Sequence, residues 1–446
     1  MFEQYSTDPI FNVKAVVHQT GVSAATLRAW ERRYGVPSPP RTESGYRLYS
    51  ARDIAIIRWL KAQVESGLSI SQAVQLLRSL QSANTRSEPA SAPSPDPHNT
   101  CQRLHDVIIE SARTFDEQRI DQALNEAFSL LSIEDVCEGL IQPVLRTVGE
   151  LWASGALDVS MEHFVTNVLR RRLMALMNAA PAPLREARII AACAPQEYHE
   201  VGLLVLALLL RRRGYSVVYL GQDTPGARLA EAVAQAQAQV VLLSASTLVA
   251  AANLLDAVEA LRAQPNGHAV RIAFGGRIFS RVPALQRRVP ATHLAERARE
   301  AVAQIESLIA SPPLHPDYTL LLNDRQNGND LIARLRLLQT QAVDRFARDA
   351  ALLDALAQVP IEQLQAVASE LIALILAALR LHAPEALRDP EVVRWRRTDE
   401  AAPHGLPMPL IANLLSEVWR ALLSAQEFDA LAPYLNALRT AVHLQT

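Results

Sequence analysis

The sequence ARIIAACAPQEYHEVG (187–202) places a short apolar run before a polar loop. Three similar runs follow, YSVVYL (215–220), QVVLLS (239–244) and VRIAF (270–274), and helical sequence comes after each of them. Short apolar strands that alternate with helices are typical of a parallel sheet covered by helices on both faces. We therefore predict a doubly wound α/β domain over residues 183–312, here called the sheet domain.

The loop after the first predicted strand contains a histidine and an acid two residues before it. Loops at the carboxyl ends of parallel strands form the ligand-binding edge of such sheets. His199 in this loop can ligate a metal held in a cofactor, and Glu197 can hydrogen-bond to the ring and orient it. A single loop histidine is more often simply solvated, so this loop alone leaves both interpretations open.

Features of three loops at the same edge favour a ligand. Gly202 allows close approach at the start of a helix, and Ser246, after the third strand, offers a small hydroxyl to a buried polar group. The pair Gly275-Gly276 follows the fourth strand and leaves room for a ligand, because neither residue has a Cβ atom. Together with His199, these features predict a binding site along one edge of the sheet.

The order ExHxxG, SxL and GG after successive strands resembles the cobalamin-binding domain shared by methionine synthase and certain mutases. The resemblance covers about residues 187–310 and implies a flavodoxin-like sheet that holds the nucleotide tail of the cofactor. It also implies that His199 is the lower axial ligand of cobalt. The family acid is usually Asp, so Glu197 is a departure that we expect to alter tuning more than binding. The implied cofactor-binding residues are Glu197, His199, Gly202, Ser246, Leu248, Gly275 and Gly276.

The first 80 residues, here called the head, are basic although the chain as a whole carries a formal charge of -2. They hold ten Lys/Arg and six Asp/Glu, a balance of +4. Two short helices, Val13 to Gln19 and Ala24 to Tyr34, are predicted around a Gly21-Val22 turn, which makes a helix-turn-helix candidate. Ser44-Gly45 then predicts a hairpin, and a capping box at Ser50 predicts a further helix.

Arginines on the second head helix can pair with phosphates or with guanine edges, although a solvated charged helix would look similar. The segments VKAVVHQTGVSAATLRAWERRYG and RTESGYRLYSARDI closely resemble the MerR family of winged-helix regulators over residues 12–80. The resemblance implies double-stranded operator DNA as a partner and dimerisation. The candidate DNA contacts on the helix and the hairpin are Arg28, Arg32, Arg33, Arg41, Tyr46 and Arg47.

A Ser-, Pro- and Ala-rich segment (81–100) predicts a flexible linker after the head. Residues 101–182, here called the bundle, have helical periodicity throughout and predict a four-helix bundle. The expected helices lie near 102–113, 116–131, 133–152 and 158–179.

The bundle contains Trp152 and, nine residues later, the pair Glu162-His163. These side chains could converge above a flat ligand, or they could be a core tryptophan and an ordinary amphipathic helix. The W-x9-EH pattern before a cobalamin domain resembles the CarH/LitR light-sensing repressors, which implies adenosylcobalamin, with Trp152 over the adenosyl group and Glu162 and His163 lining its pocket. Several members have a histidine where this chain has Ala153. The cobalt ligand after illumination is therefore left open between water, His163 and another group.

Residues 313–446, here called the tail, lie outside these resemblances and hold twelve Arg and sixteen acids, a balance of -4. The pattern predicts an all-α interaction or sensory domain that could take a protein partner. Its longest apolar run, Leu371 to Leu379, is short of the ~20 residues that a membrane helix needs. Three cysteines are too few for a disulfide framework, so we expect a cytoplasmic protein without a membrane partner.

The leading hypothesis is a transcriptional repressor that performs no catalysis. Adenosylcobalamin would favour a homo-oligomer, a dimer or a tetramer, whose several heads hold DNA together, and light would release it. A corrinoid carrier or methyltransferase-type protein is the first alternative, but it leaves the head unexplained; a mutase would need a barrel of ~250 residues. The second alternative is a cobalamin-independent MerR-family regulator controlled by a protein partner, which Ala153 leaves open.

Overall fold

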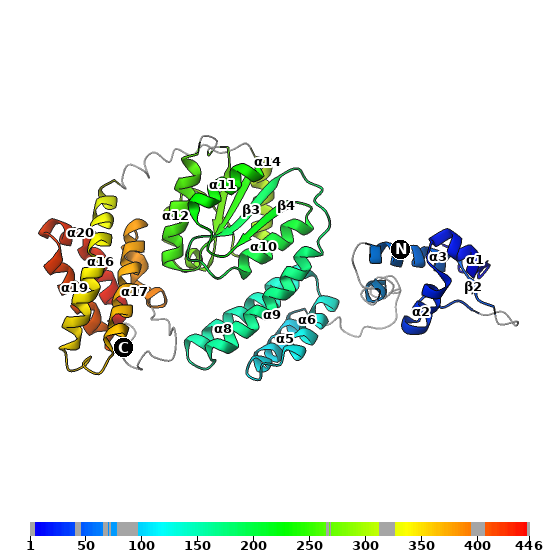
Figure 1. Cartoon of the computed structure of the whole chain (residues 1–446), viewed down its shortest axis with the longest axis horizontal. Coiled ribbons are helices and arrows are strands. Elements are labelled where there is room, and N and C mark those ends of the chain that lie inside the picture. Colours follow the sequence, from blue (N-terminus) through cyan, green and yellow to red (C-terminus); the bar gives the residue numbers. More distant parts are fainter. Residues whose placement is uncertain are drawn as a thin grey trace. The chain divides into compact units, whose positions relative to one another are not determined.

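The computed structural model describes most of the chain. The described residues are 5–40, 46–65, 70, 73–77, 97–264, 267, 269–311, 326–393 and 406–443. They divide into two compact units, Met1–Asp96 and Pro97–Thr446, which we describe separately. Figure 1 traces the elements along the chain.

The head is a small helical domain with one two-stranded ribbon. Its elements are β1 (Phe11–Asn12), α1 (Val13–Thr20), α2 (Ala24–Tyr34), β2 (Leu48–Tyr49) and α3 (Ala51–Glu65). β1 pairs antiparallel with β2, a pairing that the sequence did not predict because neither strand has more than two residues.

Local hydrogen bonds explain where the head helices begin and end. The Ser23 hydroxyl accepts a bond from Thr26 N (3.1 Å) at the start of α2. Gly21 adopts a left-handed φ of 67° at the end of α1, which confirms the predicted turn between the two helices. Ser50 and Asp53 form the predicted capping box before α3. The predicted turn at Ser44-Gly45 lies outside the described residues.

The bundle comprises α5 (Pro97–Ala112), α6 (Glu117–Leu130), α8 (Gln142–Ala153) and α9 (Val159–Asn178). α5 begins inside the segment expected to be linker. The helix expected over 133–152 is interrupted: α7 (Ile133–Val136) leads into a π-helical turn, η1 (Cys137–Ile141), before α8. A continuous apolar pattern does not reveal such a turn, because an inserted residue keeps the chain helical.

The sheet domain contains a five-stranded parallel sheet in the order β4-β3-β5-β6-β7. The strands are β3 (Arg188–Cys193), β4 (Ser216–Gly221), β5 (Val240–Ser244), β6 (Arg271–Gly275) and β7 (Thr292–His293). This is the order of flavodoxin-like folds. Four strands confirm the prediction; β7 was not predicted, because it has two residues and no apolar run.

Helices cover both faces of the sheet (Figure 1). Residues that alternate along β3 enter different cores: Ile189 packs with α10 (Val201–Arg212) and α14 (Ala298–Ala310), and Ile190 packs with α11 (Gly226–Ala236) and α12 (Leu248–Arg262). The bundle shares the core that contains α10 and α14. Two short elements, α13 (Arg277–Arg281) and η2 (Pro283–Arg287), follow β6.

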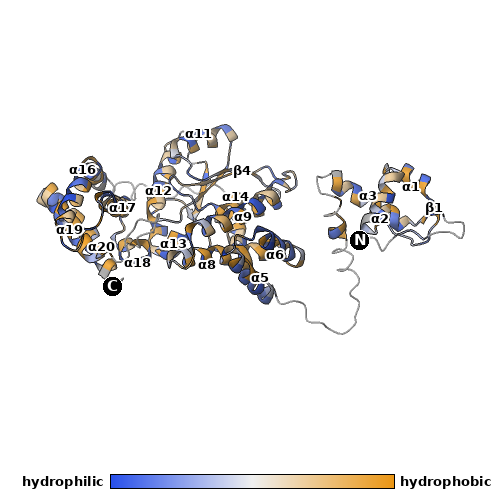
Figure 2. Cartoon of the chain, turned by 60° about the horizontal axis from the view of Figure 1, so that its bottom comes forward, coloured by the Kyte–Doolittle hydropathy of each residue, from blue (hydrophilic) through white to orange (hydrophobic). Residues whose placement is uncertain are grey.

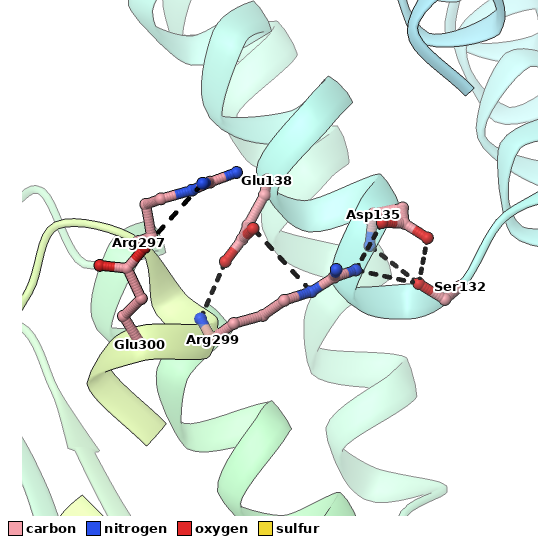
Figure 3. A network of polar contacts seen from close by, with 6 residues as sticks. All are labelled: Ser132, Asp135, Glu138, Arg297, Arg299 and Glu300. Atoms are coloured by element: carbon pink, nitrogen blue, oxygen red, sulfur yellow. Dashed lines mark hydrogen bonds and ion pairs between the residues drawn. The ribbon is translucent and has the colours of Figure 1, made fainter. Parts of the chain in front are cut away.

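A polar network fixes the bundle against α14 (Figure 3). The Arg299 guanidinium donates to Asp135 Oδ1 (2.5 Å) and Ser132 Oγ (3.3 Å), and Arg299 N donates to Glu138 Oε1 (2.8 Å). The hydrogen bonds of Ser132 and Arg299 hold the pKa of Asp135 below its usual value, although partial burial opposes them. These contacts therefore hold the bundle against the sheet domain in one position.

The described part of the tail is helical, as expected. Its elements are α16 (Gln326–Ala351), α17 (Ile361–Arg380), η3 (Pro384–Arg388), α18 (Pro390–Val393), α19 (Met408–Leu422) and α20 (Ala425–His443). Figure 2 shows hydrophobic and hydrophilic residues mixed along these helices. By length and composition alone α17, at 20 residues, is long and apolar enough to cross a membrane. The apolar run expected from the sequence, Leu371 to Leu379, is shorter than this helix. Half of its apolar window is buried, in the core of the tail and against α12.

Candidate functional site

The strand order reverses between β3 and β5, which are neighbours in the sheet although the chain visits β4 between them. Loops that leave the carboxyl ends of strands at such a reversal diverge and open a crevice. The loop after β3 carries Glu197 and His199, and the loop after β5 carries Ser246. The fold therefore brings the predicted ligand-binding loops to its crevice.

Glu197 joins these two loops. Its side chain is fully buried, and Oε1 accepts hydrogen bonds from both the backbone N and the ring Nδ1 of His199, each 2.7 Å long. Oε2 accepts a short hydrogen bond from the backbone N of Ser246. An ionised carboxylate can only accept at Nδ1, so Nδ1 carries a proton, and in the neutral ring Nε2 then carries the lone pair. The His199 side chain is 55% exposed.

The charge state of Glu197 follows from these contacts. Burial by itself raises the pKa of a carboxyl group. The pKa of Glu197 nevertheless lies below its usual value, because hydrogen bonds from the ring and backbone of His199 and from the backbone of Ser246 favour the ionised form. Glu197 is therefore ionised at neutral pH and can hold the imidazole in one tautomer and one orientation.

The predicted glycines differ in why they are needed. Gly276 has a φ of 122°, and a Cβ atom there would lie 2.0 Å from Ala245 O, so the backbone itself requires glycine. A Cβ at Gly202 would meet no atom within 4 Å, and one at Gly275 would meet only Leu294 Cβ, at 3.9 Å. Apart from the backbone of its own helix, the described chain therefore leaves the Cβ position of Gly202 open.

The remaining predicted residue of this edge, Leu248, is 1% exposed and packs in the apolar core. It is the first residue of α12, and the Thr247 hydroxyl caps that helix by accepting from Ala250 N (3.1 Å). The SxL motif thus places Ser246 at the crevice and anchors its loop through Leu248.

Sequence reasoning missed the role of Glu200. This buried carboxylate accepts a 2.6 Å hydrogen bond from the Tyr219 hydroxyl of β4 and a short one from Arg170 of α9. Burial and the neighbouring Glu200 raise the pKa of Tyr219 well above its usual value. The one available signal was an acid directly before the apolar helix that begins at Val201. Glu200 ties the bundle to the loop that carries His199.

The bundle residues form a second group. Trp152 is half-buried near the end of α8, and Glu162 and His163 lie in the first turns of α9. His163 Nδ1 lies 2.5 Å from Glu162 Oε2, and the Thr166 hydroxyl donates to Glu162 Oε1 (3.0 Å). Among the described residues, no hydrogen bond or ion pair joins this group to Glu197 or His199.

The head presents the predicted DNA contacts in different ways. Arg28 and Arg32 are exposed on α2, and Tyr46 is exposed beside β2. Arg47 Nε donates to Glu31 Oε2 (2.7 Å), a bond that raises the pKa of Arg47 and ties the residue before β2 to α2. The side chain of Arg33 and all of Arg41 lie outside the described residues.

Comparison with known protein families gives a DNA-binding family for the head and cobalamin-binding families for the bundle and the sheet domain. The model described as MerR HTH family regulatory protein matches residues 11–80, and two B12 binding domain models match residues 187–305 and 104–177. The fold and these matches define a MerR-family DNA-binding regulator with a cobalamin-binding domain. The matches end at residue 305, before the tail.

Individual relatives agree. The chain is 35% identical over 258 residues to the HTH-type transcriptional repressor CarH of Myxococcus xanthus, covering 58% of this chain and 86% of the relative. It is 35% identical over 235 residues to CarA of the same organism, covering 52% and 75%. The chain belongs to the family of HTH-type transcriptional repressors that includes CarH and CarA. The structure of a Methanosarcina barkeri monomethylamine corrinoid protein aligns with 48% of this chain and 100% of that protein, at 18% identity and a TM-score of 0.40.

The residues at the crevice fit a cobalamin. A single imidazole is too small a ligand set for a free metal ion, but it suits cobalt whose other positions are held by a corrin ring. His199 offers an exposed ring with Nε2 available, and the open space beside Gly202 leaves room for close approach. The donor set of this chain therefore agrees with the family match.

Proposed function

We propose that this protein is a cytoplasmic transcriptional repressor that uses adenosylcobalamin as a light-sensing cofactor. In the dark, the loaded protein forms a dimer or tetramer that holds operator DNA. Light-driven loss of the adenosyl group changes the oligomeric state and releases the DNA. The observation that carries the proposal is the buried Glu197 carboxylate that orients His199 at the crevice, in a chain that also carries a MerR-type head.

Within this proposal, Nε2 of His199 would ligate the cobalt of the bound cofactor. Glu197 would hold the proton on Nδ1, so that the neutral ring presents the lone pair of Nε2 to cobalt. Ser246, Gly275 and Gly276 would lie beside the nucleotide tail, and Gly202 would allow the corrin ring to approach closely. Leu248 anchors the Ser246 loop in the apolar core.

The bundle residues would bind the other face of the cofactor. The Trp152 indole would cover the adenosyl group, and Glu162 and His163 would line its pocket, with Glu162 held by the Thr166 hydroxyl. Bound adenosylcobalamin supplies a cobalt–carbon bond that light cleaves. The bundle contacts the sheet domain through Glu200 and Arg299. Loss of the adenosyl group would change how the bundle packs at this contact.

The heads would read DNA as a set. The contacts proposed for each head are Arg28, Arg32, Arg33, Arg41, Tyr46 and Arg47. Several heads on one oligomer raise the affinity for an operator through effective concentration, so dissociation of the oligomer is enough to release DNA.

Absorbance and size measured on one sample test the proposal. The protein is purified in the dark with adenosylcobalamin, and its spectrum and elution volume on gel filtration are compared before and after green light. We expect retained cobalamin, a spectral change on illumination and a smaller particle afterwards. Failure to retain cobalamin would refute the proposal.

A second candidate, a sensor of cofactor level, is favoured by Ala153, because this position lacks the imidazole that several family members have there. Such a protein would bind DNA differently with and without cobalamin but identically in the dark and after green light.

A further inference from the structure

A largely buried arginine of the tail forms ion pairs with the sheet domain. Arg380, at the end of α17, donates from Nε to Asp256 Oδ1 (2.6 Å) and pairs with Glu259, both on α12. Its side chain is only 11% exposed. A guanidinium withdrawn from water needs both charge partners in place, so this contact fixes the position of α12 against α17.

A second ion pair holds the element after the glycine pair. Arg281, the last residue of α13, makes a bidentate contact with Asp389 of the tail, with both N–O distances 2.9 Å. Bidentate guanidinium–carboxylate pairs are directional as well as strong. α13 begins directly after Gly275-Gly276, so this pair anchors the far end of a short element whose near end is the predicted cofactor loop.

α12 itself reaches the histidine loop. Asn253 lies one turn before Asp256, and its Nδ2 donates to Pro195 O (2.9 Å) and Gln196 Oε1 (3.2 Å). Gln196 has a left-handed φ of 62° and directly precedes Glu197. A shift of α12 along its axis would therefore disturb the loop that orients His199.

The tail contacts two helices that lead out of the proposed cofactor loops. α12 follows the Ser246 loop and α13 follows the Gly275-Gly276 loop. α12 also hydrogen-bonds to the His199 loop. The apolar packing of α17 on α12 makes the tail and this face of the sheet domain one continuous core. The described tail therefore packs on the helices that support two loops of the proposed cofactor site.

We propose that the tail is a positioning domain for the cobalamin site, and that Arg380 is a positioning residue that couples tail docking to cofactor binding. The proposal rests on the proposed function of the crevice. Coupling is reciprocal: if docking of the tail favours the bound arrangement of the His199 loop, cobalamin binding must tighten tail docking by the same factor. Anything that binds the described tail surface and loosens Arg380 would then lower cobalamin affinity.

The test compares Arg380→Met with Arg345→Met in the full chain. Arg345 is a matched control, because its exposed ion pair with Asp349 lies within α16 and does not touch the sheet domain. Two readouts are taken: hydrogen exchange at the amides of Gln196 and His199 in cofactor-free protein, and the Kd for adenosylcobalamin from absorbance titration in the dark. Gln196 N donates to Asp223 Oδ1 in the loop after β4, and His199 N donates to Glu197 Oε1, so both amides report the order of the His199 loop.

We expect faster exchange at both amides in Arg380→Met and a Kd at least about 5-fold weaker, the lower end of typical coupling between sites. The control should match the wild type in both. Unchanged exchange and unchanged Kd in a folded Arg380→Met protein would overturn the inference. If that variant does not fold, Asp389→Asn provides the same comparison at the second ion pair.

The two proposals fail in different ways. A wild-type protein that binds no cobalamin refutes the proposed function, whereas the exchange readout needs no cofactor and still tests whether Arg380 orders the His199 loop. Normal binding with no difference between Arg380→Met and the control refutes the positioning role and leaves the proposed function standing.

Discussion

Replacing Glu197 with glutamine tests the contact on which the site depends. Glu197 is fully buried and accepts three N–H groups, from His199 N, His199 Nδ1 and Ser246 N. Glutamine keeps one acceptor oxygen, but its amide nitrogen would face a donor. Hydrogen bonds to a charged group contribute about 1.5–3 kcal/mol each, so we expect Glu197→Gln to lower the free energy of unfolding by about 2–4 kcal/mol.

The same change should weaken cofactor binding. Loss of the carboxylate partner of a metal-ligating histidine typically reduces metal affinity about 10–100-fold. We therefore expect the Kd for cobalamin, from absorbance titration, to rise by that factor in Glu197→Gln. Glu231→Gln on α11 is the control, because Glu231 is exposed and paired with Arg228.

The pH dependence has a fixed sign. Because the folded protein holds the pKa of Glu197 below its usual value, the ionised side chain stabilises the fold above the ordinary carboxyl range. That stabilisation is lost as the pH falls from this range through the lower folded pKa. Urea unfolding at pH 7 and at acidic pH should show a smaller loss in Glu197→Gln than in the wild type. Equal stability and equal cobalamin affinity in the variant and the wild type would refute the reasoning.

Three further predictions concern other parts of the chain. Gly276→Ala should lower the free energy of unfolding by about 3 kcal/mol, because alanine is strained at a φ of 122°. Gly202→Ala should leave the free energy of unfolding, measured in urea, unchanged or slightly raised, and should still weaken cobalamin binding. Arg28→Ala should weaken DNA binding and reduce the slope of log K against log salt by about 1, measured by fluorescence anisotropy; an unchanged slope would exclude a phosphate contact. Burial beside Phe274 lowers the pKa of His293, so the wild type should lose stability as the pH falls below the usual histidine range, and His293→Gln should flatten this dependence in urea unfolding at pH 5 and 7.

The sequence predicts those parts of the fold that short-range patterns control. Apolar runs such as ARIIAAC identify the buried parallel strands, and the capping box at Ser50 locates the start of α3 in the head. The two-residue strands β1, β2 and β7 escape detection, because their stability comes from partners and not from their own residues.

The site shows the same limit. Glu197, His199 and Ser246 could be named from their places after successive strands, since the carboxyl ends of parallel strands share one edge. The contacts of Glu200 with Arg170 and Tyr219 could not, because they join residues 30 and 19 positions apart through tertiary packing. The same holds for Arg380, whose carboxylate partners on α12 lie more than a hundred residues away in the sequence.

We propose that cobalamin, held by His199, controls the affinity of the heads for DNA. The most direct measurement is DNA affinity, for fragments selected from a random pool by the loaded protein in the dark. Affinity is then compared without cofactor, with adenosylcobalamin in the dark and with the same sample after green light, for the wild type and His199→Ala. We predict tight binding only by dark, loaded wild type. Equal affinity in all conditions would contradict the account.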